Sequence, residues 1–267
     1  MFKLGIIGCG NMGGAMLRQM LKAGLFTPEE VIVSDKNPSL RAQLKSELGV
    51  NVTYRNEEAA AATTLLLAVK PQFIQAVGRE IADVVKPDAL IISIVAGYDL
   101  AMLHGLLQSE TAHIIRVMPN TPAMVGEVVL AACRGQHVTD EEWKLGMKLL
   151  SCMGMAEEVT ENLMDAVTGL SGSSPAFVFL FMEALADAGV RAGLPRAAAQ
   201  RFAAQVLVGS GKLAQDTGLH PGQLKDMVTS PAGTTIEGVA ALEKNGFRYA
   251  VMEAVDAAVQ KSKNLGK

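Results

Sequence analysis

The stretch Thr229–Gly238, TSPAGTTIEG, combines hydroxyl side chains with residues that have almost no side chain. It leads directly into VAALEKNGF, which predicts a helix. The N-terminus of a helix presents backbone N–H groups without partners, so it can bind a carboxylate without a cation. The loop TSPAGTT contains no arginine or lysine that could pair with such an anion. The stretch is therefore a candidate carboxylate site, although a plain Ser/Thr N-cap would explain the same residues.

A second candidate site lies at the start of the chain. Lys3–Ile7 predicts a short apolar strand, GCGNMG follows at Gly8–Gly13, and GAMLRQMLKAG then predicts a helix. In the order strand, turn and helix, GxGxxG is the fingerprint of a dinucleotide site. Gly8 permits the turn, Gly10 lets the backbone approach a pyrophosphate, and Gly13 lets the helix pack on the strand. A generic glycine turn is the alternative, and the elements that follow argue against it.

Strand and helix patterns alternate over the first half of the chain. EVIVSD, TTLLLAVKP, ALIISIVAG and HIIRVMPNTP predict short, almost wholly apolar strands, as parallel strands buried on both faces require. Asn37 caps the predicted helix NPSLRAQLKSELG, and Phe73 and Val77 belong to the apolar stripe of QFIQAVGREIADVV. This order predicts an α/β fold with a Rossmann-type, doubly wound sheet. Ligand should bind at the carboxyl ends of its strands, which carry Gly8–Gly13, Ser34, Ala68–Pro71, Val95–Gly97 and Met118–Pro122.

The end of the second predicted strand bears on which dinucleotide is bound. An acidic residue there would bind a ribose diol and favour NAD, and Asp35 stands near that place. Ser34 and Lys36 flank it, and a hydroxyl with a cation can hold the 2′-phosphate of NADP. From the residues alone, the two cofactors are expected about equally.

The second half of the chain predicts helices. EVVLAAC and MAEEV still predict strands, separated by a helix whose start carries the capping box of Thr139 and Glu142. Beyond residue 160 every long segment predicts a helix, and the segment 176–182, AFVFLFM, is apolar all round and must be covered on every side. We expect a homo-oligomer, with a well-packed monomeric domain as the alternative. The predicted domains are a dinucleotide-binding domain, 1–160, and an all-helical dimerisation and substrate domain, 161–267.

Composition excludes several classes of partner. The net charge is −3 without a basic block, so neither nucleic acid nor an anionic membrane is expected. No apolar run reaches the roughly 18 residues that span a bilayer, and the N-terminus does not predict a signal peptide. The three cysteines and four histidines have no metal-ligand or disulfide spacing. We expect a cytoplasmic protein with no metal.

Taken together, the motifs resemble those of the pyrroline-5-carboxylate reductase family over nearly the full length. The resemblance rests on IIGCGNMG, LLLAVKP, RVMPNTP, DAVTGLSGSSPAF, AGLPR, HPGQLKDMVTSPAGTTIEG and GFR, of which HPGQLKDMVTSPAGTT is the most specific. It implies an NAD(P)H-dependent imine reductase that converts 1-pyrroline-5-carboxylate to L-proline, the last step of proline biosynthesis. It implies NADPH as the usual cofactor, with NADH as the second. It also implies a homodimer whose helical part completes the partner's active site, often in a ring of dimers such as a homodecamer.

The resemblance also implies roles for individual residues. Thr235 is the hydroxyl matched to the ring nitrogen and is the expected catalytic residue. The expected substrate contacts are Glu161, Ser230, Gly233, Thr234 and Thr235. The expected cofactor contacts are Ile7, Gly8, Cys9, Gly10, Asn11, Met12, Ser34, Asn56, Ala68, Val69, Lys70, Pro71 and Ala96.

Two residues depart from the family pattern. Ser174 replaces the second glycine of the usual SGSGP, and Ala232 replaces a glycine of the usual SPGGTT. Alanine suits that position only if it does not need a positive φ. Two other functions compete: a two-domain hydroxyacid dehydrogenase, and a protein that binds NADPH without turnover. The dehydrogenases generally need a lysine on the helix after the glycine-serine motif, and here none follows until Lys212.

Overall fold

The computed structural model describes residues 2–264, apart from the side chains of residues 123 and 124. The chain forms two compact units: a sheet unit, Met1–Gly172 with Ala258–Lys267, and a helical unit, Ser173–Ala257. The boundary expected after residue 160 precedes this division. The reason is local packing, because Met164 and Val167 pack with Ala131 and Cys133 of the sheet.

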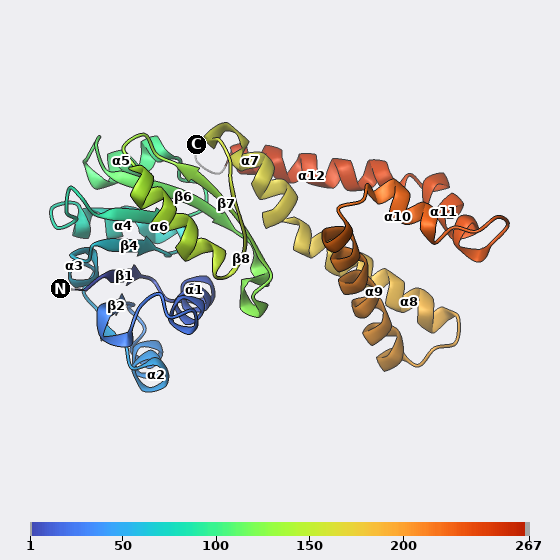
Figure 1. Cartoon of the computed structure of the whole chain (residues 1–267), viewed down its shortest axis with the longest axis horizontal. Coiled ribbons are helices and arrows are strands. Elements are labelled where there is room, and N and C mark those ends of the chain that lie inside the picture. The colour runs from blue at the N-terminus through green and yellow to red at the C-terminus, as the bar shows by residue number, and fades with distance from the viewer. Residues whose placement is uncertain (1, 265–267) are drawn as a thin grey trace. The chain divides into compact units, whose positions relative to one another are not determined.

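The sheet unit is built on eight strands in the order β3-β2-β1-β4-β5-β6-β7-β8 (Figure 1). All neighbouring strands are parallel except β6 and β7, which are antiparallel. The order reverses between β1 and β4, the switch point at which doubly wound sheets bind ligands. The strands are β1 (Leu4–Ile7), β2 (Val31–Ser34), β3 (Asn51–Thr53), β4 (Thr64–Leu67), β5 (Leu90–Ser93), β6 (His113–Pro119), β7 (Val128–Arg134) and β8 (Gly154–Glu158).

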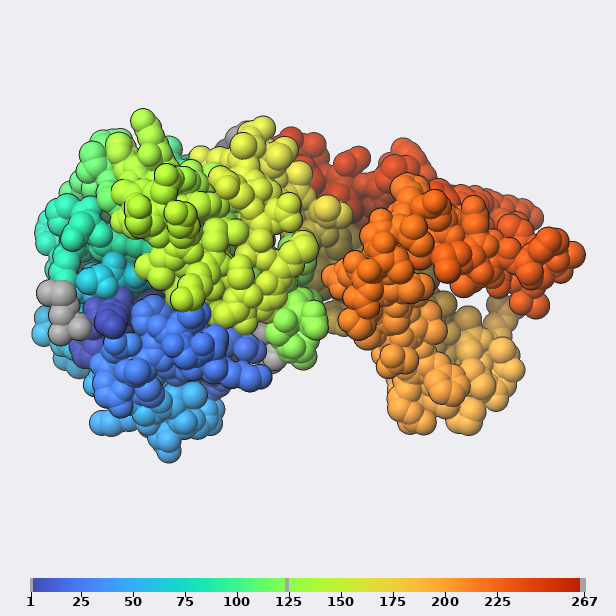
Figure 2. Space-filling model, in the orientation of Figure 1, coloured from blue at the N-terminus to red at the C-terminus, as the bar shows by residue number. Residues whose placement is uncertain are grey.

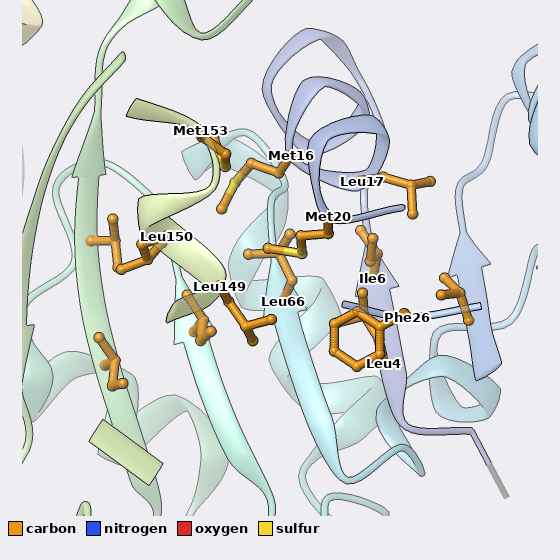
Figure 3. Packing of buried hydrophobic residues seen from close by; sticks show 14 of the residues in the cluster. Leu4, Ile6, Met16, Leu17, Met20, Phe26, Leu66, Leu149, Leu150 and Met153 are labelled. Atoms are coloured by element: carbon orange, nitrogen blue, oxygen red, sulfur yellow. The ribbon is translucent and has the colours of Figure 1, made fainter. Parts of the chain in front are cut away.

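Helices cover both faces of the sheet. Alternate strand residues point to opposite faces, so Leu4 and Ile6 pack in one apolar cluster and Ile7 in the other. Figure 3 shows the first cluster, where Met16 and Leu149 lie near strand residues. The first face carries α1 (Asn11–Lys22), α2 (Pro38–Leu48) and α6 (Asp140–Ser151), and the second carries α3 (Asn56–Ala60), α4 (Pro71–Ile81) and α5 (Leu100–Leu107).

Local signals predicted most of these elements. Asn37 Oδ1 accepts hydrogen bonds from the Ser39 and Leu40 N–H groups, and the capping box of Thr139 and Glu142 is present. The sequence analysis missed β3 and α3, which are too short for a periodic pattern, and α5, a short segment that is apolar apart from His104.

One predicted core residue was wrong. Phe73 is 55% exposed, because the face of α4 that packs on the sheet carries Ile74 together with the predicted Val77 and with Ile81.

The helical unit has a small internal core. Helices α8 and α9 pack through Ala186, Ala199 and Ala203, and their small side chains allow a close approach. Large apolar side chains remain outside this core: Phe179 is 60% exposed and Leu180 is 68% exposed. The space-filling view shows open space between the α8–α9 hairpin and the segment around α11 (Figure 2). The helices are α8 (Ser174–Arg191), α9 (Arg196–Thr217), α10 (Pro221–Met227), α11 (Thr234–Lys244) and α12 (Phe247–Lys263).

Among the described residues, the helical stretch Glu161–Arg191 has the length and composition of a membrane-crossing helix. Such a match is weak evidence, because a core helix of a soluble protein passes the same test. The stretch is also irregular: a 3₁₀ turn at Glu161–Leu163, α7 (Met164–Val167) and a π-helical segment at Thr168–Gly172 precede α8. π-helical segments are rare and frequently occur at functional sites.

Candidate functional site

The glycine turn at the carboxyl end of β1 has the geometry that a dinucleotide site requires. Gly8 has φ +85°, and its N–H donates to the Ser34 carbonyl at 2.9 Å. A Cβ on Gly13 would lie 2.5 Å from the Gly8 carbonyl oxygen, so a side chain there would push α1 off the turn. The structural roles predicted for these two glycines, in the turn and in the packing of α1, are confirmed.

Gly10 differs, because no neighbouring atom in the described part of the chain explains why it is glycine. A Cβ there would meet no described atom within 4 Å. Gly10 is the N-cap of α1, and no side chain caps that helix. The space beside it is thus open to a ligand, and no side chain occupies the cap position at the N-terminus of α1. This arrangement fits a pyrophosphate.

A cavity of about 540 Å³ lies next to this turn. Its polar lining includes Arg18 and two residues at the start of α2, Asn37 and Ser39. These side chains can donate hydrogen bonds to an anionic group. The sequence analysis did not identify these residues as ligands. Its prediction of Asn37 as a helix cap already explained that residue. The full lining is Cys9, Gly10, Asn11, Ala15, Arg18, Asn37, Ser39, Leu40 and Gln43.

Asp35 holds the turn in place. Its carboxylate accepts the Cys9 N–H and the Asn37 N–H, both at 2.9 Å. Its carbonyl accepts the Arg41 guanidinium at 2.6 Å. Both carboxylate oxygens therefore bind backbone, and a ribose diol would have to share them. This geometry weakens the reason for expecting NAD.

Ser34 and Asn56 form a buried polar pair at the end of β2. The Ser34 hydroxyl donates to Asn56 Oδ1 at 2.7 Å, and Asn56 Nδ2 donates to Glu80 at 2.7 Å. Lys36 lies 3.6 Å from the same Glu80 carboxylate. Direct contact between Ser34 and a 2′-phosphate would require the first of these bonds to break.

The Cys9 thiol lies within the turn but is not a nucleophile. Burial, helped by the nearby Asp35 carboxylate, raises its pKa to about 12. The thiol is therefore neutral at ordinary pH, and only a thiolate would react or bind metal. Among the described residues, no group of three or more His, Cys, Asp or Glu side chains could hold a metal ion.

The other predicted cofactor residues lie along the same edge of the sheet. The Ala68 N–H donates to the Ile7 carbonyl at 2.9 Å, which ties the end of β4 to the glycine turn. Lys70 is the N-cap of α4 and Pro71 its first residue. Ala96 is half-buried in the loop after β5. Asn11 and Met12 are the first two residues of α1, and Val69 lies in the loop between β4 and α4.

Glu161 lies in the sheet unit, apart in the chain from the other predicted substrate residues. Its Oε1 accepts the Leu100 N–H at 2.7 Å and Arg116 Nη1 at 3.1 Å. The side chain is 35% exposed, so it is partly buried.

The loop before α11 belongs to the helical unit, and it is not a Ser/Thr cap. The N-cap of α11 is Gly233, and no side chain caps the helix. The hydroxyls of Ser230, Thr234 and Thr235 are exposed and form no hydrogen bond within the described part of the chain. The simpler explanation by a hydroxyl N-cap is therefore wrong, and three hydroxyls stand beside a bare helix N-terminus.

The same loop contains a strained residue. The Gly233 N–H donates to the Ser230 carbonyl at 3.1 Å, closing a turn over Pro231 and Ala232. Ala232 has φ +56°. Proline followed by a residue of positive φ is the pattern of a type II turn, which favours glycine at the second place. The condition under which alanine would suit this position is therefore not met.

Known proteins are similar to this chain over its whole length. Residues 161–265 match a family described as pyrroline-5-carboxylate reductase dimerisation, and residues 3–97 match one described as NADP oxidoreductase, coenzyme F420-dependent. A pyrroline-5-carboxylate reductase of Synechocystis sp. is 47% identical over 99% of this chain and 98% of its own. That of Methanosarcina acetivorans is 44% identical with the same coverage. The crystal structure of Plasmodium falciparum pyrroline carboxylate reductase with NADP bound has a TM-score of 0.88 and 34% identity, covering 100% of this chain and 98% of that one.

Proposed function

Because the chain belongs to the pyrroline-5-carboxylate reductase family, we propose that it reduces 1-pyrroline-5-carboxylate to L-proline with NADPH. The observation that carries the proposal is the loop before α11. There the N-terminus of α11 has no side-chain cap, and three hydroxyls without partners in the described chain surround it. This is the chemistry that a small ring with one carboxylate and one imine nitrogen requires.

The substrate carboxylate would bind the backbone at the start of α11. Thr234 and Thr235 are the first two helical residues, so their N–H groups have no intrahelical acceptor. Gly233 has no side chain, and a Cβ there would lie 2.3 Å from the Ser230 hydroxyl oxygen. The absence of a cation in the loop is no obstacle, since the partial positive charge of a helix N-terminus favours an anion.

The imine nitrogen would face the Thr235 hydroxyl. When bound, a reduced nicotinamide supplies the hydride that adds to the imine carbon. The electron pair of the C=N double bond then remains on the nitrogen, which in the iminium form already carries its proton. Threonine is a poor general acid because its pKa is far from neutral. Thr235 would therefore act by aligning the nitrogen, and most of the rate would come from holding the reacting atoms in line.

The dinucleotide would lie on the carboxyl edge of the sheet. Gly8, Gly10 and Asn11 would hold the pyrophosphate, and the predicted contacts at Ser34, Asn56, Ala68–Pro71 and Ala96 remain part of the proposal. Arg18, Asn37 and Ser39 line the neighbouring cavity and suit a 2′-phosphate. NADP in the Plasmodium relative and the engagement of Asp35 by backbone both support NADPH over NADH.

The helical unit would form the dimer. Its exposed Phe179 and Leu180 need cover, and the match to a dimerisation family supports a second copy as that cover. In this arrangement the loop before α11 would serve the partner's active site, and dimers could assemble further into a ring such as a decamer. The three free cysteines support the proposed reducing, cytoplasmic location.

One assay distinguishes the functions. Oxidation of NADPH and of NADH is followed optically with 1-pyrroline-5-carboxylate and, separately, with a 2-keto acid. Turnover with the imine and a higher kcat/KM for NADPH are expected. Turnover only with the keto acid would replace the proposal by a hydroxyacid dehydrogenase. Binding of NADPH without turnover of either would make the protein a nucleotide binder.

A further inference from the structure

Arg116 lies in β6 as a nearly enclosed charge that the proposed chemistry does not yet use. Its side chain is 14% exposed, and in the register of the sheet it pairs with Cys133 of β7, whose thiol is buried. Burial, then the charge of Glu161, raise the pKa of the Cys133 thiol to about 11, so the thiol is neutral. The guanidinium therefore has one anionic partner in the described part of the chain, Glu161.

The contacts of Glu161 are unequal between its two oxygens. Oε1 accepts both the Leu100 N–H, at 2.7 Å, and Arg116 Nη1, at 3.1 Å. Oε2 accepts no hydrogen bond from any described residue. One oxygen is thus fixed from two directions, while the other remains available to a ligand.

The two residues that hold Glu161 Oε1 come from α5 and β6 of the sheet unit. Leu100 begins α5, directly after the loop that contains Ala96, and Glu161 begins the helical stretch that leads to the π-helical segment at Thr168–Gly172. Arg116 lies in β6 and contacts Glu161 from the sheet. A half-buried ion pair of this kind contributes little net stability, because desolvation offsets the attraction. A role in positioning accounts better for its placement.

We infer that Arg116 is a positioning residue, which orients Glu161 so that its free oxygen faces the protonated nitrogen of the substrate. This inference rests on the proposed function. It adds that the negative charge beside the iminium depends on Arg116, since Glu161 without its partner would be a poorly compensated, partly buried carboxylate. Without the guanidinium the carboxylate keeps only the Leu100 N–H as a hydrogen-bond donor, so it can rotate away from the substrate.

Four variants of the full-length protein test this: Arg116→Met, Arg116→Lys, Glu161→Ala and the double variant Arg116→Met with Glu161→Ala. For Arg116→Met we expect the KM for 1-pyrroline-5-carboxylate to rise roughly 10- to 100-fold, as for a misplaced group at a reacting centre. The Kd for NADPH should stay within about twofold of wild type, because Arg116 does not line the dinucleotide site. Arg116→Lys should recover part of the loss, since it keeps the charge but not the fixed fork. The double variant should be no worse than Glu161→Ala alone.

Each alternative result points to a different error. A raised KM in Glu161→Ala with a normal KM in Arg116→Met would reject Arg116 as a positioning residue. A lowered melting temperature of Arg116→Met with unchanged KM would show a structural role only. A normal KM in Glu161→Ala would remove the substrate role of Glu161 and this inference with it. Wild-type protein that does not turn over the imine at all would reject the proposed function itself.

Discussion

This chain has two candidate loops, the turn at Gly8–Gly13 and the loop Ser230–Thr235. They differ in how many of their groups have hydrogen-bond and packing partners within the chain. The turn is held by its own neighbours: Asp35 accepts the Cys9 N–H, and Gly13 fits against the Gly8 carbonyl. The loop before α11 has three exposed hydroxyls and an uncapped helix, and its unit exposes large apolar side chains. The turn is held by groups of the sheet unit, whereas the loop before α11 leaves its hydroxyls exposed, and under the proposed function a ligand and a second copy of the chain would cover them.

The largest effect on assembly and activity should come from a charge placed on the exposed apolar surface of the helical unit. Leu180→Glu replaces a side chain that is 68% exposed in the isolated chain. If a second copy covers it, the change removes about 2 kcal/mol of apolar burial from each copy and adds a carboxylate that must be desolvated. We expect a monomer by light scattering and no detectable imine reduction, while NADPH still binds to the sheet unit.

Leu145→Glu is the matched control for that variant. Leu145 is 40% exposed on α6 of the sheet unit, so the same chemical change falls on the self-contained unit. Its mass should equal that of the wild type. A Leu180→Glu protein with unchanged mass, or a Leu145→Glu protein that dissociates, would place the interface elsewhere.

The next effect concerns the hydroxyl at the reacting centre. Thr235→Ala should leave a folded oligomer that binds NADPH but transfers hydride to the imine roughly 10- to 1,000-fold more slowly, since one aligned hydrogen bond is lost. Single-turnover hydride transfer and melting temperature should be measured on the same preparation. Near-normal hydride transfer with a lowered melting temperature would make Thr235 a structural residue.

Thr229→Ala provides the contrast within the same loop. The Thr229 hydroxyl donates to the Lys225 carbonyl at 3.1 Å. It is therefore hydrogen-bonded within the protein and is not available to a ligand. Its loss should lower stability by about 1 kcal/mol and leave hydride transfer close to the wild-type rate.

These contrasts also explain how much the sequence could predict. Caps and turns depend on residues a few positions apart, so Asn37, Thr139 with Glu142, and the roles of Gly8 and Gly13 could be predicted from short motifs. The pairs formed by Glu161 with Arg116 and by Ser34 with Asn56 join distant segments. No local pattern specifies such pairs, and the engagement of Asp35 by the Cys9 N–H was equally invisible.

A smaller effect separates two glycines of the dinucleotide turn. In Gly13→Ala the new methyl group would lie 2.5 Å from the Gly8 carbonyl, so stability should fall by about 1–3 kcal/mol. In Gly10→Ala it meets no described atom within 4 Å, so the melting temperature without ligand should change little. The Kd for NADPH should nevertheless rise at least about tenfold, because the methyl group occupies the space that the pyrophosphate needs. Calorimetric melting and fluorescence titration measure the two effects. Normal NADPH affinity in Gly10→Ala would move the pyrophosphate away from this turn.

The smallest effect, on stability and KM, concerns the backbone strain at Ala232. This residue lies in the loop before α11, whose hydroxyls are exposed. Its φ of +56° is a left-handed conformation that costs a non-glycine residue roughly 1–2 kcal/mol. Ala232→Gly removes this strain but also gives the unfolded chain more freedom, which offsets about 0.4–1 kcal/mol. We therefore expect a net stabilisation between about 0 and 1.6 kcal/mol, and a modestly lower KM for 1-pyrroline-5-carboxylate because the turn reaches its conformation more easily. Ala240→Gly, in the middle of α11, is the control: there glycine relieves no strain and should destabilise by about 1 kcal/mol. Equal destabilisation in both variants would show that Ala232 does not have a positive φ in the working enzyme.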